Sequence, residues 1–544
     1  MHNSPANLRF LFALLTHEGA PAAKLWESFR QNFSRDYLPY NHDYDSAPTL
    51  AIEQAFQSCL NTIVEILASF GLSNTAVGLL PAHERPAADE SEQEHFAPKR
   101  QALRSKAAAA FQQFNDQQKQ IYTDVLQSIL SPSPHTLHLI QGRAGRGKTF
   151  LLQAIINNLR GHGHLLIICG ATGLSAATFD RGTTVHKRFA IPVIEQGTET
   201  EAVLQSTMRA NSPNARFIRA ATAIVIDELW SLPRAVIEAV DRLLRSLLDD
   251  SKPFGGKPLI GVGDPRQTAP VTTENTKQAT LENSFITSEL LSNFTIHELE
   301  TSQRQSRDPD FSAWIDLIGD GSTLSTVDLG EMFDITVMPE DAMDFLFPPD
   351  VLIQPARAVE RCMLSPLNST VDSFNNIILQ RLSSEIHTKD ARDTIKDGEN
   401  ANELDVQAAL ETLALIPHVG VPHRTLLLKD GQLCSIMRNL NVERGLVKHA
   451  RVSIECIYQR SIKVKLLSSG MTYLLPRINF TFQPKSSPFV IHRCQFPLRA
   501  AYATTFHGCQ GLTLSRTVID CGTPIFAHGQ RYAATSRTRA RTDT

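Results

Sequence analysis

The residues best suited to chemistry lie in a glycine-rich stretch between an apolar strand-like segment and an apolar helix-like segment. Residues 139–155 read LIQGRAGRGKTFLLQAI, which contains the pattern G-x-x-x-x-G-K-[ST] of a P-loop. Glycines let backbone N–H groups converge on phosphates, lysine neutralises β- and γ-phosphate oxygens, and the hydroxyl takes a position on Mg²⁺. A glycine turn without function is the alternative. We expect a nucleoside triphosphate to contact Gly142, Ala144, Gly145, Arg146, Gly147, Lys148 and Thr149.

Polar groups that suit hydrolysis follow two further apolar segments. AIVIDELW places Asp227 and Glu228 directly after a strand-like run. We expect Asp227 to hold Mg²⁺ through water, and Glu228 to orient and deprotonate the attacking water. Gln267, in GVGDPRQ, follows the next strand, where its amide would touch the γ-phosphate or that water. For Asp227 and Glu228 the alternative is an ordinary exposed acidic strand end. For Gln267 the alternative is a surface loop without function.

The segments around these residues alternate between helical and strand patterns. Between residues 111 and 271, continuous apolar strands alternate with helices, which predicts an α/β fold with a parallel sheet covered on both faces. A second α/β stretch starts near residue 294. The expected organisation is a helical region at 1–80, a linker at 81–110, a first lobe at 111–293 with a small insert at about 192–215, a second lobe at 294–423 and 485–544, and an inserted β-barrel at 424–484.

Bulk composition sets wider limits. The 544 residues are 42% hydrophobic, enough to bury several cores. A net charge of −3 neither supports nor forbids nucleic acid as a partner. The eight cysteines form no C-x-x-C pair and have no histidine at metal-binding spacing, so we interpret them as reduced intracellular thiols. No apolar run approaches the ~18 residues of a membrane span, so we expect neither a membrane nor a secreted protein.

Residues 111–540 resemble the PIF-type and RecD-like helicases of superfamily one, and within them the helicase region of Helitron transposons. The resembling segments occur in the family's order: FNDQQKQIY, the P-loop, ATGLSAATFDRGTTVHKRF, the acidic strand end, GDPRQ, LETSQRQS, YATTFHGCQGLTL and RYAATSRTRA. The resemblance implies two RecA-like P-loop NTPase lobes with parallel sheets. It also implies an SH3-like β-barrel inserted in the second lobe and a helical region before the first.

Further site residues are implied by this resemblance alone. Gln118 would recognise adenine, Arg304 and Arg537 would reach the γ-phosphate as arginine fingers, and Gly511 would lie at the nucleotide edge. The remaining family positions would approach single-stranded DNA: Thr172, Gly173, His186, Thr505 and His507.

The activity that the resemblance implies is ATP-dependent DNA unwinding with 5′-to-3′ movement on single-stranded DNA. It implies ATP and Mg²⁺ as cofactors, single strands and duplex junctions as partners, a monomer, a nuclear location, and work in repair, recombination, telomere maintenance or transposition.

Two departures from the family pattern support an alternative, a transposon-derived relic that binds nucleotide or DNA without moving. Gly508 and Cys509 replace the family's lysine and serine. The family also continues past the position of Arg537 into a further strand, so we expect an uncovered sheet edge in the second lobe. A P-loop kinase or switch is disfavoured because it leaves the second-lobe motifs unexplained.

Overall fold

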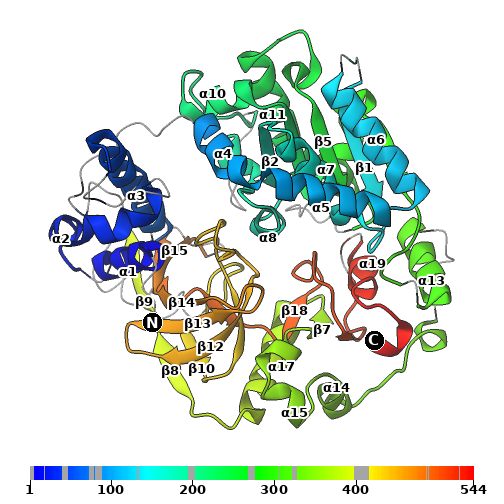
Figure 1. Ribbon diagram of the computed structural model, residues 1–544. Coiled ribbons are helices and arrows are strands. Elements are labelled where there is room, and N and C mark those ends of the chain that lie inside the picture. Colours follow the sequence, from blue (N-terminus) through cyan, green and yellow to red (C-terminus); the bar gives the residue numbers. More distant parts are fainter. Residues whose placement is uncertain are drawn as a thin grey trace. The chain divides into compact units, whose positions relative to one another are not determined.

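The computed structural model describes residues 5–544 except 18, 39–43, 45–46, 71, 73–76, 78, 80–87, 132, 134, 194–202, 268–275, 306, 322–327, 397–415, 485–486, 488, 526 and 528. The chain divides into two compact units (Figure 1). Unit 1 comprises Met1–Arg85, Val351–Val359 and Asn376–Ala501. Unit 2 comprises Pro86–Asp350, Glu360–Asn375 and Tyr502–Thr544, and it carries every predicted site residue.

A six-stranded parallel sheet forms the centre of unit 2, in the order β3-β2-β4-β5-β1-β6. Its strands are β1 (Leu137–Gly142), β2 (Leu166–Gly170), β3 (Thr183–Thr184), β4 (Ala223–Asp227), β5 (Leu259–Gly263) and β6 (Thr295–Leu299). The predicted parallel sheet is confirmed.

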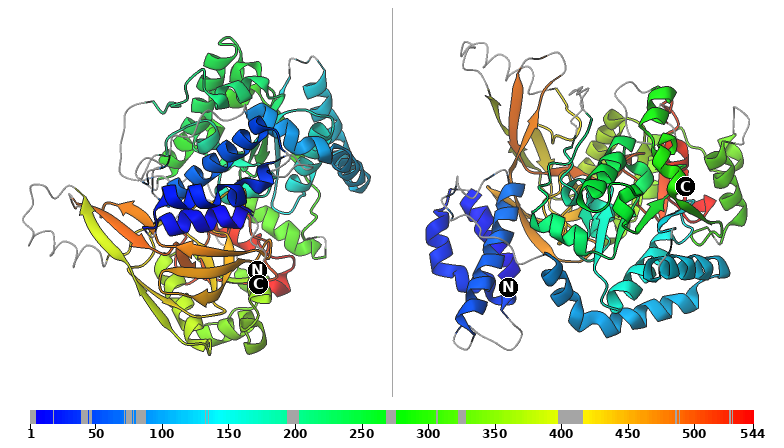
Figure 2. Two further views of the ribbon diagram at one scale, coloured as in Figure 1. Left: turned by 60° about the vertical axis from the view of Figure 1, so that its left-hand side comes forward. Right: turned by 90° about the horizontal axis from the view of Figure 1, so that it is seen from above.

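Helices cover both faces of this sheet (Figure 2). On β1, Leu139 packs on the face covered by α10 (Pro213–Ala220) and α11 (Arg234–Leu247). The next residue, Ile140, packs on the opposite face with α5 (Arg100–Gln113), α6 (Asp116–Leu130) and α7 (Lys148–Gly161). Successive strand residues point to opposite faces. A strand buried on both faces therefore reads as a continuous apolar run, as observed.

Two predicted boundaries are wrong. β6 pairs with β1, so the first lobe ends after residue 299 and not at 293. The expected linker at 81–110 is helical from residue 88 onward, in α4 (Ala88–Phe96) and α5. Its acidic composition suggested solvation, but buried Glu92 accepts a hydrogen bond from buried Arg160 of α7 at 2.7 Å. A tertiary ion pair of this kind leaves no apolar periodicity in the sequence.

A smaller parallel sheet also lies in unit 2, with β7 (Arg361–Ser365) between β18 (Ala503–Thr505) and β19 (Arg516–Ile519). It confirms the predicted second α/β region. Two helices of this region matter for the site: α13 (Pro309–Asp320) and α19 (Gln530–Thr535), which pack together. Further helices are α8 (Gly173–Ala177), α9 (Val185–Arg188), α12 (Lys277–Asn283), α14 (Pro339–Leu346), α15 (Pro349–Leu352), α16 (Pro355–Ala358) and α17 (Asn368–Arg381).

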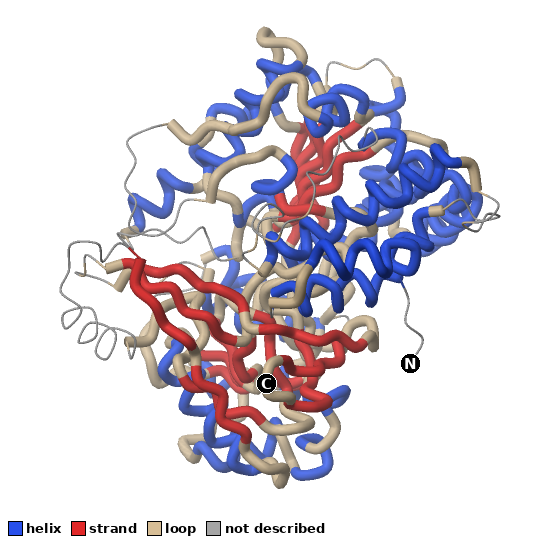
Figure 3. Tube along the Cα trace, turned by 90° about the vertical axis from the view of Figure 1, so that its left-hand side faces the viewer, coloured by secondary structure: helices blue, strands red, loops and turns tan. Residues whose placement is uncertain are grey.

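Unit 1 combines the predicted N-terminal helices with antiparallel sheets (Figure 3). The helices are α1 (Pro5–His17), α2 (Ala22–Ser34) and α3 (Thr49–Ser69). A five-stranded sheet has the order β14-β13-β12-β11-β17, and smaller sheets pair β15-β16-β9 and β10-β8. The strands are β8 (His387–Asp390), β9 (Arg392–Lys396), β10 (Thr425–Leu428), β11 (Leu433–Ile436), β12 (Arg451–Ile457), β13 (Ser461–Leu466), β14 (Thr472–Pro476), β15 (Ile478–Phe482), β16 (Val490–Gln495) and β17 (Leu498–Ala500).

These sheets are consistent with the predicted barrel-like insertion, but its expected range of 424–484 is too narrow. β8 and β9 precede that range, and β16 and β17 follow it. The α/β pattern resumes at β18 rather than at residue 485. Among the described helices, not one combines the length and the apolar character needed to cross a membrane.

Candidate active site

The P-loop has the conformation that its glycines predict. Gly145 and Gly147 have φ of +78° and +83°, a backbone region that L side chains rarely adopt. A Cβ atom at Gly145 would lie 2.4 Å from the Arg304 Cβ, and one at Gly147 would lie 2.7 Å from the Gln118 Nε2. Lys148 begins α7, and its Nζ donates to the carbonyl of Gly142 at 2.6 Å. Because Gly145 and Gly147 have no side chains, Arg304 and Gln118 can lie close to the P-loop backbone.

Next to this loop lies a cavity of about 580 Å³ inside unit 2. Six of its described lining residues are lysine or arginine, and Glu228 is the acidic one. Such an excess of positive charge favours an anionic ligand. The predicted residues that line this cavity are Ala144, Gly145, Arg146, Gly147, Lys148, Thr149, Glu228, Gln267, Arg304, Gly511 and Arg537.

The two predicted carboxylates lie beside Lys148. Asp227 ends β4, and Glu228 follows with a φ of +56°. Burial, and next the charge of Glu228, raise the pKa of Asp227 to about 7. Burial likewise raises the pKa of Glu228, against the opposing charge of Lys148. Burial lowers the pKa of Lys148 against the opposing charges of Asp264 and Glu228. Burial thus shifts the pKa of each of these three groups in the direction that favours its neutral form.

Arg304 and Arg537 reach the same cavity from different segments. The Arg304 guanidinium donates to the Ser536 carbonyl at 2.8 Å and to the Thr513 hydroxyl at 2.9 Å. Arg537 is 2% exposed and donates to the Ser536 hydroxyl at 2.7 Å. Burial, and next the charge of Arg537, lower the pKa of Arg304 to about 9. Two cations this close repel each other, and the negative charge of a bound phosphate would offset that repulsion.

Three residues that line this cavity each have a buried polar atom without a hydrogen-bond partner within the described part of the chain. The atoms are the Arg146 Nε, the Gln267 Oε1 and the Arg537 Nε. Buried polar groups in proteins are almost always hydrogen-bonded. The Gln267 Oε1 needs a donor and an arginine Nε–H needs an acceptor, and water and a phosphate together would supply both.

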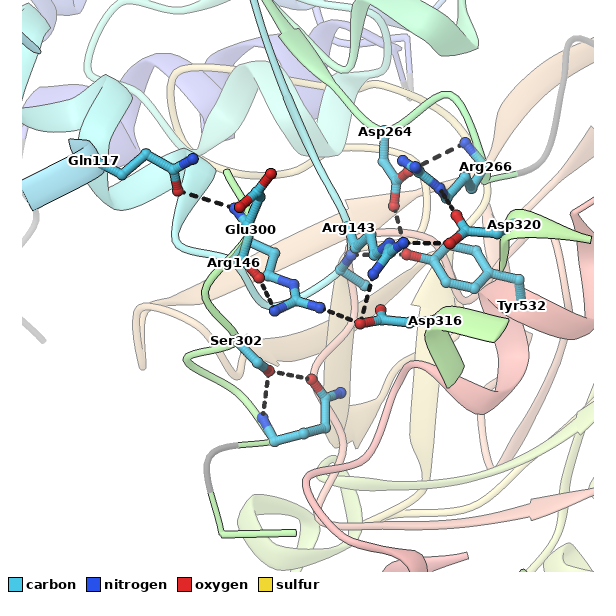
Figure 4. Close-up of polar contacts among 12 residues, drawn as sticks. Gln117, Arg143, Arg146, Asp264, Arg266, Glu300, Ser302, Asp316, Asp320 and Tyr532 are labelled. Atoms are coloured by element: carbon cyan, nitrogen blue, oxygen red, sulfur yellow. Dashed lines mark hydrogen bonds and ion pairs between the residues drawn. The ribbon is translucent and has the colours of Figure 1, made fainter. Parts of the chain in front are cut away.

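Sequence reasoning missed Tyr532 and Asp264, which join three segments at the P-loop (Figure 4). The Tyr532 hydroxyl of α19 accepts from the Ala144 N–H at 2.9 Å and donates to the Asp264 carboxylate at 2.8 Å. Tyr532 lies five residues before Arg537, and Asp264 lies three before Gln267. Their position inside two recognised motifs was the available signal, but no spacing rule links a tyrosine to a P-loop amide.

Gln118 also lies at the P-loop. It is 3% exposed, and Asn115 caps the start of α6 by accepting from the Gln118 N–H at 2.8 Å. Its carboxamide nitrogen points at Gly147, as the close approach above shows. The structure therefore brings Gln118 next to Gly147 of the P-loop, but Gln118 is not a lining residue of the cavity.

The residues expected to contact DNA do not line the cavity. Thr172 is exposed and caps the start of α8, whereas Gly173 is buried. His186 lies within hydrogen-bond distance of the Ile191 carbonyl, at 3.2 Å. The Thr505 hydroxyl accepts from the Gly508 N–H at 3.2 Å, and His507 lies 3.4 Å from the Gln530 amide nitrogen. Their contact with DNA stays a prediction.

Known proteins resemble this chain over most of its length. Residues 113–328 match the family model described as PIF1-like helicase. The human ATP-dependent DNA helicase PIF1 is 28% identical over 405 residues, which cover 73% of this chain and 56% of the human protein. This chain thus spans about half the length of that relative. The Pif1 helicase of Bdellovibrio bacteriovorus is 25% identical, covering 74% of this chain and 82% of the bacterial protein.

Among solved structures, the Pif1 helicase from Bacteroides in complex with ADP-AlF3 and ssDNA has a TM-score of 0.56 at 21% identity. The match covers 79% of this chain and 91% of that one. It supports the fold with two α/β regions and an antiparallel insertion. The expected likeness to Helitron helicases in particular stays a prediction. Residues 113–328 therefore match the PIF1-like helicase family, and the relatives extend the similarity over about three quarters of this chain.

Proposed function

We propose that this chain is an ATP-dependent DNA helicase that couples ATP hydrolysis to 5′-to-3′ movement on single-stranded DNA and to duplex unwinding. One observation carries the proposal: Arg304 and Arg537 meet Lys148 and Glu228 in one cavity, where Arg537 and Gln267 each keep a buried polar atom without a partner among the described residues. A cavity so arranged suits a transferred phosphoryl group.

The residues divide the work of hydrolysis. Lys148 and the P-loop amides hold the phosphates, and Gln118 holds adenine. Glu228 accepts a proton from the attacking water, which Gln267 orients with its free carbonyl oxygen. Arg304 and Arg537 stabilise charge that develops on the phosphoryl oxygens. Gly511, which lines the cavity, would lie at the nucleotide edge.

Mg²⁺ fits this site in the way it usually binds proteins. Mg²⁺ keeps several waters and takes one or two protein oxygens together with substrate phosphates. Thr149 and Asp227 would supply those protein oxygens, and a bound Mg²⁺ would neutralise charge on the β- and γ-phosphates.

Movement on DNA would follow from the arginine contacts. Arg304 and Arg537 come from segments far from the P-loop in sequence, so loss of the γ-phosphate frees those segments to shift. Single-stranded DNA would be held by backbone contacts and base stacking that do not depend on sequence. We assign Thr172, Gly173, His186, Thr505 and His507 to that contact. Both curated relatives described above are named ATP-dependent DNA helicases, which supports the proposal.

The relic alternative is not favoured, because the residues needed for hydrolysis are retained and gathered in one cavity. The deciding experiment is ATP hydrolysis by the purified chain with and without single-stranded DNA. We expect DNA to stimulate hydrolysis several-fold and Lys148→Ala to abolish it. Lys119→Ala, which removes a half-exposed lysine of α6, is the matched control and should hydrolyse like the wild type. Hydrolysis that ignores DNA, or that survives Lys148→Ala, would refute the motor.

Direction and context need separate measurements. Forked DNA with a single 5′ or a single 3′ tail tests direction, because 5′-to-3′ movement requires unwinding only from the 5′ tail. We propose a monomer that acts in the nucleus in repair, recombination, telomere maintenance or transposition. Sedimentation at micromolar concentration and imaging of a fluorescent fusion test the first two points.

A further inference from the structure

Two arginines of the P-loop are bound to acidic residues of α13 (Figure 4). Arg143 pairs with Asp316 at 2.6 Å and also with Asp320. Arg146 pairs with Asp316, and its side chain is only 7% exposed. Asp320 in turn pairs with Arg266 at 2.7 Å. A P-loop that carries two arginines between its glycines therefore has both charges compensated before any nucleotide binds.

Arg146 also holds the stretch of chain that delivers Arg304. We call residues 300–305, which follow β6, the connecting segment. Arg146 donates a second hydrogen bond to the Glu300 carbonyl, while the Glu300 N–H donates to the Gln117 side chain of α6 at 3.0 Å. A single guanidinium thus joins the P-loop, α13 and the start of the connecting segment.

The other end of the connecting segment is bound to the P-loop backbone. The Gly145 carbonyl accepts from the N–H groups of Gln303 and Arg304 at 2.9 and 3.0 Å. Gly145 immediately precedes Arg146, so two consecutive residues of the P-loop bind both ends of the connecting segment. The Arg304 guanidinium then reaches Ser536 and Thr513 at the cavity.

Asp316 is what keeps Arg146 in this position. It shares its carboxylate between Arg143 and Arg146, and it is 19% exposed. Removing one partner of a buried ion pair leaves an uncompensated charge, which then seeks water or another anion. Without Asp316, Arg146 would turn away from α13 and would loosen its bond to the Glu300 carbonyl.

We propose that Arg146 and Asp316 are positioning residues, which hold the connecting segment so that Arg304 meets the γ-phosphate during hydrolysis. The proposal rests on the proposed function only for its effect on turnover, since the restraint on the segment is present without nucleotide. It gives the P-loop arginine a task other than phosphate binding.

The first test measures the restraint itself. Hydrogen–deuterium exchange of the nucleotide-free protein, read on peptides that cover residues 300–305, is compared for the wild type, Asp316→Asn and Asp320→Asn. We expect Asp316→Asn to speed exchange of the Gln303 and Arg304 amides at least about fivefold. Asp320→Asn is the matched control, since Asp320 lies on the same helix and pairs with arginines but does not contact Arg146 in the described structure. Equal exchange in the wild type and Asp316→Asn overturns the proposal.

The second test measures turnover on the same proteins. We expect Asp316→Asn to lower kcat at least about tenfold, or about 1.4 kcal/mol of transition-state stabilisation, with KM and ADP affinity nearly unchanged. Asp316→Glu should recover part of kcat because it restores the carboxylate. An equal loss in kcat and ADP affinity, or tighter nucleotide binding by the released Arg146, overturns the proposal.

The two proposals can fail separately. A wild type without DNA-stimulated hydrolysis refutes the helicase, while the exchange experiment still decides whether Asp316 restrains the segment. Should Asp316→Asn unfold, Arg146→Gln removes the same bonds from the other side and must speed exchange of the same peptides.

Discussion

Replacing Tyr532 by phenylalanine isolates the hydrogen bonds that tie α19 to the P-loop. The tyrosine ring is 2% exposed, so phenylalanine keeps its packing against Ala144, Phe311 and Ile315. Burial raises the pKa of Tyr532, with the Asp264 charge adding to it, so the hydroxyl stays protonated and donates to Asp264. The substitution therefore removes two hydrogen bonds and little else.

The expected loss of stability depends on which hydrogen bonds Asp264 and Ala144 keep after the Tyr532 hydroxyl is removed. A hydrogen bond to a charged group contributes about 1.5–3 kcal/mol, and a bond between neutral groups contributes about 1 kcal/mol. Asp264 is 2% exposed and keeps its bond from the Arg266 N–H at 3.1 Å, which favours the lower half of the first range. Together with the lost bond from Ala144, Tyr532→Phe should destabilise unit 2 by about 2.5–3 kcal/mol.

The assay is urea unfolding followed by tryptophan fluorescence in a Trp26→Phe background. The remaining tryptophans, Trp230 and Trp314, both belong to unit 2, so the signal reports on that unit. Tyr122→Phe is the matched control, because Tyr122 is also a buried tyrosine of unit 2 and its hydroxyl interacts with the neutral side chain of Asn158. It should cost about 1 kcal/mol. If Tyr532→Phe costs no more than Tyr122→Phe, the bonds to Asp264 and Ala144 do not stabilise the unit as reasoned.

Three further outcomes are expected. Arg537→Ala should lower kcat by about 10³-fold while ATP affinity changes little, because the proposed arginine finger acts on the transition state; equal losses in single-turnover rate and ATP binding would contradict this. The raised pKa of Asp227, about 7, should make kcat/KM fall about tenfold per unit as the pH drops below that value, which a pH–rate profile checks. Burial lowers the pKa of His138 in the folded state to about 4. Below pH 6.5 the histidine of the unfolded chain is therefore protonated while that of the folded chain is still neutral. The free energy of unfolding then falls by up to about 1.4 kcal/mol for each pH unit. The free energy of unfolding should therefore drop between pH 7.5 and 5.5 by about 1.4 kcal/mol more in the wild type than in His138→Gln; an equal drop in both would exclude His138 as the cause.

Local patterns in the sequence located one half of the candidate site. The P-loop, the acidic strand end and the GDPRQ stretch each combine a strand signal with polar residues at its carboxyl end. In a parallel sheet those ends share one edge, so Lys148, Glu228 and Gln267 had to come together once the strands were recognised. The arginines were located only through family resemblance, because a lone arginine carries no periodic signal.

Contacts between segments far apart in the chain were decided by the tertiary structure alone. Tyr532 reaches Ala144 across 388 positions, and Arg146 reaches Asp316 across 170. The same reason explains the errors: Glu92 looked like part of a solvated linker until Arg160 gave it a partner, and β6 looked like the start of a new lobe until it paired with β1. Periodicity records which face of an element is buried, whereas ion pairs and strand order depend on which elements meet, and only the folded chain fixes that.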